Sequence, residues 1–173
     1  PVQTNFLVRF KALIRKSFFS EKYIVPGYNL DNDLKERRGE YLEVSGPTKN
    51  GYALLKNKFQ NQIGGKRIYI TNKKIEDREL TDALADGENL PFKDGSIGAV
   101  FLSGISLPDK LKLLQEFFRV LEDGGIIVSQ GLSYEEVLLA EEIGFRRMLF
   151  FAVKDPRVED YYQVNVVLKK DKI

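Results

Sequence analysis

The residues of this sequence that can transfer protons are aspartate, glutamate, lysine and tyrosine, because the chain contains no histidine and no cysteine. These absences exclude a Ser-His-Asp triad, a Cys-His nucleophilic pair and a zinc-thiolate site. A metal site would need oxygen ligands alone. Since the sequence has no carboxylate cluster with suitable spacing, we expect no metal. The chemistry left open is chemistry in which a cofactor supplies the reactive group.

Four loops carry polar or small residues directly after short runs that we predict to be β-strands. They cover residues 45–51, 72–74, 86–89 and 103–106. In open α/β sheets, ligands bind outside the carboxyl ends of the strands, near the point where the strand order reverses. We therefore expect these four loops to meet at one edge of a sheet.

Two βαβ units are predicted to position these loops. In the first, a strand over 41–44 leads through a helix over 50–62 to a strand over 67–71. In the second, the apolar run 97–102 and the run 126–128 flank a helix over 108–121, which stops at Asp123-Gly124-Gly125. Strands buried on both faces read as continuous apolar runs, so both units indicate a mostly parallel sheet.

The segments around these units are less regular. Residues 4–18 predict a basic amphipathic helix that packs on its own domain, with a membrane surface as the alternative partner. Pro26-Gly27 indicates a turn, and Asp31 is a possible cap for a short helix ending at Gly39. Only thirteen residues separate Asn72 from Asp86, enough for a short strand over 80–85 but not for a full crossover helix.

The last third of the chain predicts a helix followed by a hairpin. Ser133-x-x-Glu136 is a capping box, and Gly144 ends the helix that it begins. Two strands, over 145–153 and 161–168, flank a turn and should pair in antiparallel fashion. The predicted fold is α/β: a three-layer Rossmann-like sheet, mostly parallel, with a C-terminal antiparallel hairpin and a shortened connection between its second and third strands.

Composition sets the broad class. With 173 residues, we expect one domain over 1–173, with an N-terminal helical segment over 1–40 and the core over 41–173. The hydrophobic fraction of 43% and the charged fraction of 30% are typical of soluble proteins, and a net charge of +2 does not favour nucleic acid. No apolar run approaches the roughly 20 residues of a membrane span. We expect a cytoplasmic protein, and the oligomeric state does not follow from the sequence.

Two motifs at a defined spacing resemble a known family. Residues 86–98 read DGENLPFKDGSIG, and residues 119–125 read RVLEDGG, followed later by Ile143-Gly144-Phe145. This combination resembles the class I S-adenosylmethionine-dependent methyltransferases of the type 11 kind. The resemblance covers about three quarters of the chain. It implies a Rossmann-like fold and S-adenosylmethionine as the cofactor.

The resemblance also implies site residues. Glu43 stands for the acid of the family's glycine-rich motif, Asn72 replaces the acid that accepts from the ribose, and Asp86 matches the acid that accepts from the adenine amino group. Gly98 stands where the family carries an acid in the fourth strand. No catalytic base can be assigned. The implied cofactor-binding residues are Glu43, Ser45, Gly46, Gly51, Asn72, Asp86, Gly87 and Ser103.

Three functions are compatible with these residues. The first is an S-adenosylmethionine-dependent methyltransferase acting on a small molecule. The second is a non-catalytic binding or interaction domain of the same fold, because Ser45, Asn72 and Gly98 depart from the family pattern. The third is a nicotinamide-dependent oxidoreductase, since Lys73 and Lys74 could meet a 2′-phosphate, but Gly-x-Gly-x-x-Gly is missing after the first strand.

Overall fold

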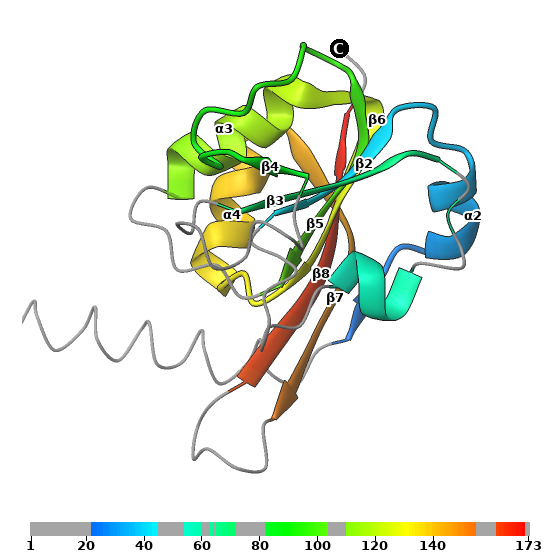
Figure 1. Ribbon diagram of the computed structural model, residues 1–173. Helices are drawn as coiled ribbons and strands as arrows, with labels where there is room; N and C mark the ends of the chain where they lie inside the picture. Colours follow the sequence, from blue (N-terminus) through cyan, green and yellow to red (C-terminus); the bar gives the residue numbers. More distant parts are fainter. Residues whose placement is uncertain are drawn as a thin grey trace, which may run out of the picture.

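A computed structural model of the chain describes residues 22–44, 54–59, 63, 65–71, 82–103, 110–154 and 162–171. The predicted helix over 4–18 lies outside these residues. The described part forms one eight-stranded sheet in the order β1-β7-β8-β6-β5-β2-β3-β4 (Figure 1). The strands are β1 Tyr23–Ile24, β2 Glu40–Val44, β3 Arg67–Thr71, β4 Ala83–Leu84, β5 Ile97–Ser103, β6 Leu121–Gln130, β7 Phe145–Lys154 and β8 Tyr162–Lys170; the helices are α2 Leu30–Lys35, the π-helix η1 Leu55–Phe59, α3 Lys110–Val120 and α4 Tyr134–Ile143.

The sheet confirms the predicted mixture of strand directions. From β4 through β3, β2 and β5 to β6, neighbouring strands are parallel. β7 and β8 form the predicted antiparallel hairpin, and β8 lies between β7 and β6. β1, which pairs with β7 at the edge, was not predicted, because it has two residues and both are exposed. None of the described helices is long and apolar enough to span a membrane.

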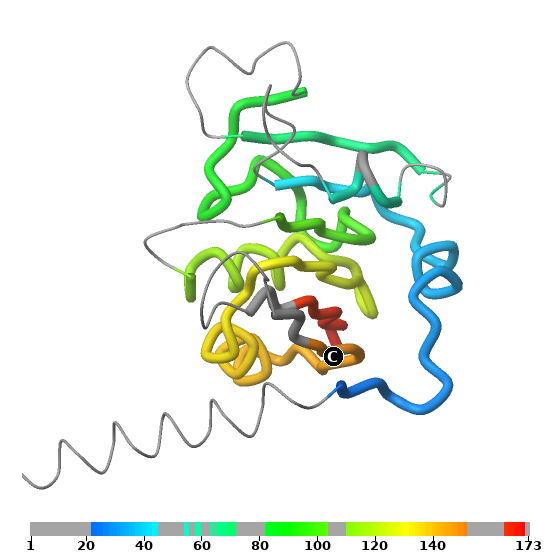
Figure 2. Tube along the Cα trace, turned by 90° about the horizontal axis from the view of Figure 1, so that it is seen from below, coloured from blue at the N-terminus to red at the C-terminus, as the bar shows by residue number. Residues whose placement is uncertain are grey.

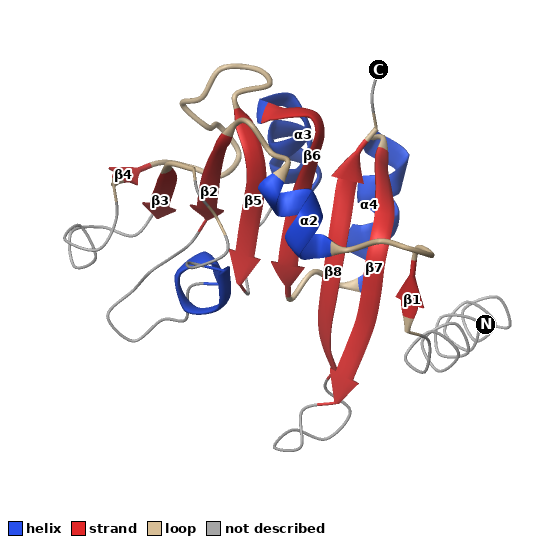
Figure 3. Ribbon diagram, turned by 90° about the vertical axis from the view of Figure 1, so that its right-hand side faces the viewer, coloured by secondary structure: helices blue, strands red, loops and turns tan. Residues whose placement is uncertain are grey.

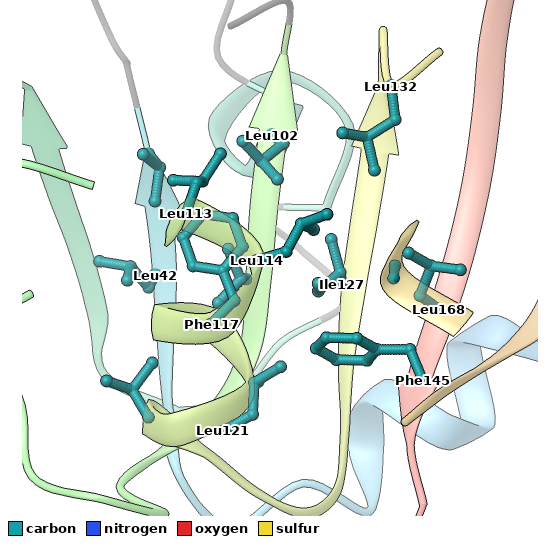
Figure 4. Packing of buried hydrophobic residues seen from close by; sticks show 14 of the residues in the cluster. Leu42, Leu102, Leu113, Leu114, Phe117, Leu121, Ile127, Leu132, Phe145 and Leu168 are labelled. Carbon is teal, nitrogen blue, oxygen red and sulfur yellow. The ribbon is translucent and has the colours of Figure 1, made fainter. Parts of the chain in front are cut away.

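Helices cover both faces of the sheet. α3 and α4 lie on one face, and α2 and η1 lie on the other (Figures 2 and 3). Successive side chains of a strand point to opposite faces, so Leu42 packs toward α3 while Tyr41 packs toward α2. Figure 4 shows the core beneath α3 and α4. Its labelled members are Leu42, Leu102, Leu113, Leu114, Phe117, Leu121, Ile127, Leu132, Phe145 and Leu168.

Two helices follow the sequence signals closely. α4 begins at the predicted capping box, in which the Glu136 N–H donates to the Ser133 hydroxyl and the Ser133 N–H donates to Glu136. α3 ends at Val120, within the motif 119–125. The three residues Asp123-Gly124-Gly125 do not form a separate loop, however. They lie within β6 at an irregularity in its pairing with β5, where Gly124 has a φ of +75°.

The prediction for α2 was wrong in its details. The helix is capped by Asn29, whose side chain accepts from the Asn32 N–H at 3.0 Å, and not by Asp31. It ends at Lys35 rather than at Gly39. The extended backbone of Asn29 lets its side chain reach back over the first turn.

A buried ion cluster fixes α2 to the sheet. The Asp33 carboxylate is 5% exposed and receives the Lys169 ammonium of β8 at 2.9 Å. It also pairs with the Arg37 guanidinium at 2.9 Å. Arg37 in turn donates to the carbonyl of Gly124 in β6. Asp33 therefore connects α2 to β8 through Lys169 and to the segment between α2 and β2 through Arg37.

The most crowded backbone contact in the described part lies between Gly39 and Gly98. A Cβ atom added to Gly39 would lie 2.4 Å from the Gly98 nitrogen, 2.7 Å from the Ile97 carbonyl carbon and 2.8 Å from the Ser96 oxygen. A Cβ added to Gly98 would lie 2.8 Å from the Arg37 Cβ. The start of β2 can therefore approach β5 only where both residues lack side chains.

We expect the Gly39→Ala substitution to lower the free energy of unfolding by about 2 kcal/mol or more, because three backbone atoms must move to admit the methyl group. Gly27→Ala is the control: its φ is +76° but nothing lies within 4 Å of the added Cβ. That substitution should cost only the conformational strain, about 1 kcal/mol. Urea denaturation compares the two variants, and equal destabilisation would contradict the steric explanation.

Candidate functional site

The carboxyl ends of four parallel strands lie in a row at one edge of the sheet. In spatial order the strands are β4, β3, β2 and β5. Asp86 follows β4, Thr71 ends β3, Glu43 is the penultimate residue of β2, and Ser103 ends β5. Parallel strands that are neighbours place their carboxyl ends on the same side, so this edge is the candidate site.

Glu43 joins three elements at this edge. Its side chain is fully buried on the face of the sheet that η1 covers. The N–H of Leu54 donates to Oε1 at 3.0 Å, and the N–H of Leu55 donates to Oε2. The Ser103 side chain also hydrogen-bonds the carboxylate. The acid thus accepts the free N–H groups at the beginning of η1, as a capping residue does, but from the neighbouring strand.

Burial changes the acidity of this group. Removal from water raises the pKa of Glu43 from 4.5 to about 7, although the N–H groups of Leu55 and Leu54 and the Ser103 side chain oppose the change. Burial raises the pKa of the Tyr69 phenol in β3, and the charge of the nearby Glu43 carboxylate raises it further. Glu43 therefore exchanges its proton near neutral pH.

Asp86 has a different environment. It follows β4 in a turn, where the N–H of Glu88 donates to Oδ1 at 3.0 Å and the N–H of Asn89 donates to its backbone carbonyl at 3.0 Å. The Asp86 side chain is exposed, while Gly87 beside it is buried. Since one oxygen satisfies the turn, the other can accept from a ligand.

Backbone pairing with β3 places this turn at the site. Thr71 pairs with Leu84, and the N–H of Ala85 donates to the Thr71 carbonyl at 3.1 Å. At the start of β4, the Asp82 carboxylate accepts from the Tyr69 N–H at 2.7 Å. The short strand β4 therefore delivers Asp86 to the carboxyl edge, although only thirteen residues separate Asp86 from Asn72.

The structure describes half of the predicted cofactor-binding residues. It brings Glu43 and Ser103 into contact, and it places Asp86 and Gly87 along the same edge, two strands from Glu43 and three from Ser103. Ser45, Gly46, Gly51 and Asn72 lie outside the described residues, so their roles stay predictions. Their flanking residues, Val44 and Thr71, end β2 and β3 at this edge.

The sequence reasoning missed two residues near the site. Arg119 and Glu116, both half-buried on α3, hydrogen-bond the segment that follows the Asp86 turn. The sequence indicated Arg119 only as a member of the motif 119–125. The available signal was an arginine three positions after a glutamate on one helix, which is also an ordinary surface pair.

Known proteins share both the sequence pattern and the fold. A family model described as a methyltransferase domain matches residues 54–129. A demethylmenaquinone methyltransferase of Geobacillus sp. (strain WCH70) is 30% identical over 114 residues, or 63% of this chain, and the chain spans 44% of the length of that relative. The resemblance to class I methyltransferases is confirmed.

Solved structures of class I methyltransferases show the same architecture. An S-adenosylmethionine-dependent methyltransferase from Methanosarcina mazei has a TM-score of 0.63 at 12% identity, with 85% of this chain and 99% of that chain covered. A geranyl diphosphate C-methyltransferase from Streptomyces coelicolor A3(2) has a TM-score of 0.61 at 12% identity, with 80% and 77% covered. At such low identities the structural likeness supports the fold.

Glu43 should make the stability of this methyltransferase fold depend on pH. The folded state binds the Glu43 proton more tightly than the unfolded state does, so the free energy of unfolding should fall as pH rises from 4.5 to about 7. The expected loss is about 3 kcal/mol. In Glu43→Gln this slope should disappear, as measured by urea denaturation at pH 5, 6, 7 and 8.

The chain contains no histidine or cysteine that could titrate in that pH range, so the slope can be assigned to Glu43. Glu116, whose pKa the Arg119 hydrogen bond lowers, adds stability that is lost only when pH falls below the ordinary glutamate range. An equally steep slope in Glu43→Gln would show that the titrating group is another residue.

Proposed function

We propose that the chain is an S-adenosylmethionine-dependent methyltransferase that transfers a methyl group to a small-molecule acceptor. The observation that carries this proposal is the exposed Asp86 carboxylate beside buried Gly87, at the carboxyl edge of a class I methyltransferase sheet. The matching family model covers β3 through most of β6, which includes this turn.

The described residues fit the adenosine part of the cofactor. The Asp86 oxygen that is not used in the turn can accept from the adenine amino group, and the Gly87 backbone N–H can address the ring. Glu43 stands two strands and Ser103 three strands away, on the side where the methionine part and the transferred methyl group would lie. Ser45, Gly46, Gly51 and Asn72 complete the proposed contacts.

When bound, S-adenosylmethionine supplies an electrophilic methyl group on a positively charged sulfur. The protein then has to hold the acceptor nucleophile in line with that methyl group and to exclude water. Glu43 serves this alignment indirectly, because it fixes the start of η1 to the end of β2. We assign no general base, since an acceptor that is already a nucleophile needs none.

An apolar cavity adjoins this edge and supports a small acceptor with an apolar part. It has a volume of about 140 Å³ and lies beside the carboxyl end of β6. Gln130, which lines it, pairs with Ser103 across the strands, and Leu54, which also lines it, donates to Glu43. Phe59, Leu149 and Phe151 supply apolar walls. The curated relative is named for demethylmenaquinone, which is compatible with an acceptor of this kind.

The alternative is a non-catalytic domain with this fold. Neutral Asn72 in place of an acid motivates it, because a neutral acceptor forfeits the charge-assisted part of a ribose hydrogen bond. Binding without turnover is the result that favours this alternative.

Thermal unfolding with added ligand tests the proposal. S-adenosylmethionine or S-adenosylhomocysteine at about 100 times its dissociation constant should stabilise the protein by roughly 2.7 kcal/mol, a shift of a few degrees, and NADP should not. Asp86→Ala should abolish most of the shift, since it removes the adenine acceptor. Asp171→Ala is the control, because Asp171 is an exposed carboxylate that follows β8, in the other half of the sheet.

A protein that shifts with neither adenosyl ligand would contradict the proposal. If binding occurs, formation of S-adenosylhomocysteine with a panel of small apolar acceptors separates the enzyme from the binding domain.

A further inference from the structure

Arg119 reaches from α3 to the segment that follows the Asp86 turn. Its Nη2 donates to the carbonyl of Leu90 at 3.0 Å, and its Nη1 donates to the carbonyl of Phe92 at 2.9 Å. Nη1 also pairs with the Asp94 carboxylate at 2.6 Å. One planar guanidinium thus holds two backbone carbonyls and a side chain of the same loop.

Glu116 completes this arrangement from one turn earlier in α3. Its carboxylate receives Nε and Nη2 of Arg119, each at 2.8 Å. The same carboxylate accepts from the N–H of Leu90 at 2.9 Å. Both the N–H and the C=O of Leu90 are therefore bound by a pair of charged residues that also bind each other. Such a two-point contact fixes the peptide orientation as well as its position.

α3 also reaches the turn that carries Asp86 through Lys112, whose ammonium lies 3.9 Å from the Glu88 carboxylate. Leu90 is buried, but Asp86 and Asn89 are exposed, and Asp94 has an 80% exposed side chain. The turn is linked to Leu90 through the antiparallel bridge between Asp86 and Asn89. A displaced Leu90 backbone would therefore shift Asn89, and with it the orientation of the Asp86 carboxylate.

From this geometry we infer that Arg119 and Glu116 are positioning residues for adenine recognition: by fixing the Leu90 backbone they aim the Asp86 carboxylate at the adenine amino group. The inference rests on the proposed function, because it assumes that Asp86 contacts the cofactor. Arg119 and Glu116 themselves touch no ligand atom in this arrangement. Their effect is on selectivity for an adenine ring.

Two ligands separate positioning from a general effect on folding. S-adenosylhomocysteine carries an amino group on its ring, whereas its purine riboside analogue carries only hydrogen there, so it cannot donate to the carboxylate but keeps the ring nitrogens as acceptors. The ratio of their dissociation constants, measured by calorimetry on the whole chain, reports how well Asp86 is aimed. A loss of overall stability alone changes both affinities together and leaves this ratio unchanged.

Four variants complete the design. Arg119→Met keeps the apolar stem of the side chain and removes the guanidinium, and Glu116→Gln keeps the shape and removes the charge. Asp86→Ala gives the ratio expected without adenine recognition. Arg147→Met is the matched control, because Arg147 forms a similar two-bond pair with Glu141 at 2.9 and 3.0 Å but lies on β7, in the other half of the sheet.

We expect the wild type to prefer S-adenosylhomocysteine and Asp86→Ala to show no preference. Arg119→Met should lose about tenfold of the preference, and Glu116→Gln should lose part of it. Arg147→Met should retain the wild-type ratio even if it unfolds at a lower temperature. Adding Arg119→Met to Asp86→Ala should change the ratio no further, because both substitutions act through one contact.

The outcomes distinguish this inference from the proposed function. A wild type that binds neither ligand contradicts both. A wild type that prefers S-adenosylhomocysteine, with the same preference in Arg119→Met and Glu116→Gln, overturns the positioning role and leaves the function intact. If Arg119→Met does not fold, the ratio in Glu116→Gln decides. A wild type without preference shows that Asp86 does not read the amino group, which also overturns the inference.

Discussion

The structure depends on one buried carboxylate, that of Glu43. An ionised carboxylate without partners inside a protein costs several kcal/mol, so its position is tolerated only where donors surround it. Here the donors come from Leu54 and Leu55 at the beginning of η1 and from Ser103 on the neighbouring strand. Residues on both sides of the 45–53 segment are thereby held at one point. The acid therefore fixes the beginning of η1 against the end of β2.

Two acids at the same edge have opposite environments, and this difference assigns their roles. Glu43 is enclosed, and its oxygens accept hydrogen bonds from the protein, which holds η1 to the end of β2. Asp86 is exposed and uses one oxygen on its own turn, so the other faces outward. Under the proposed function, the exposed acid beside the edge strand is the one that meets the ligand. The geometry of that edge also depends on α3, because β4 pairs with β3 through only two residues.

The sequence predicts what local chemistry decides. Apolar runs located β2, β3 and β5, the capping box located α4, and the turn signals located the β7–β8 hairpin, because each depends on residues close together in the chain. Features set by distant contacts were not predictable. The pairing of β1 requires β7, and the Arg119 contacts require a loop more than twenty positions away. The cap of α2 is local, but both Asn29 and Asp31 are residue types that can cap, and the extended backbone of Asn29 decides between them. At the site, the sequence resemblance named Glu43 and Asp86, but it did not indicate that the first is buried and the second exposed.

The glycine at position 98 bears on whether the altered motifs argue against catalysis. Gly98 stands where the family carries an acid, and the close approach of Gly39 and Arg37 explains the substitution by packing. It lies five residues before Ser103 in β5, which at about 3.3 Å per residue places it roughly 16 Å from the carboxyl edge. An acid there would point into the crowded start of β2 and could not reach a cofactor at the other end of the strand. The missing acid is therefore a consequence of how β2 enters the sheet, and it gives no reason to favour a domain without activity.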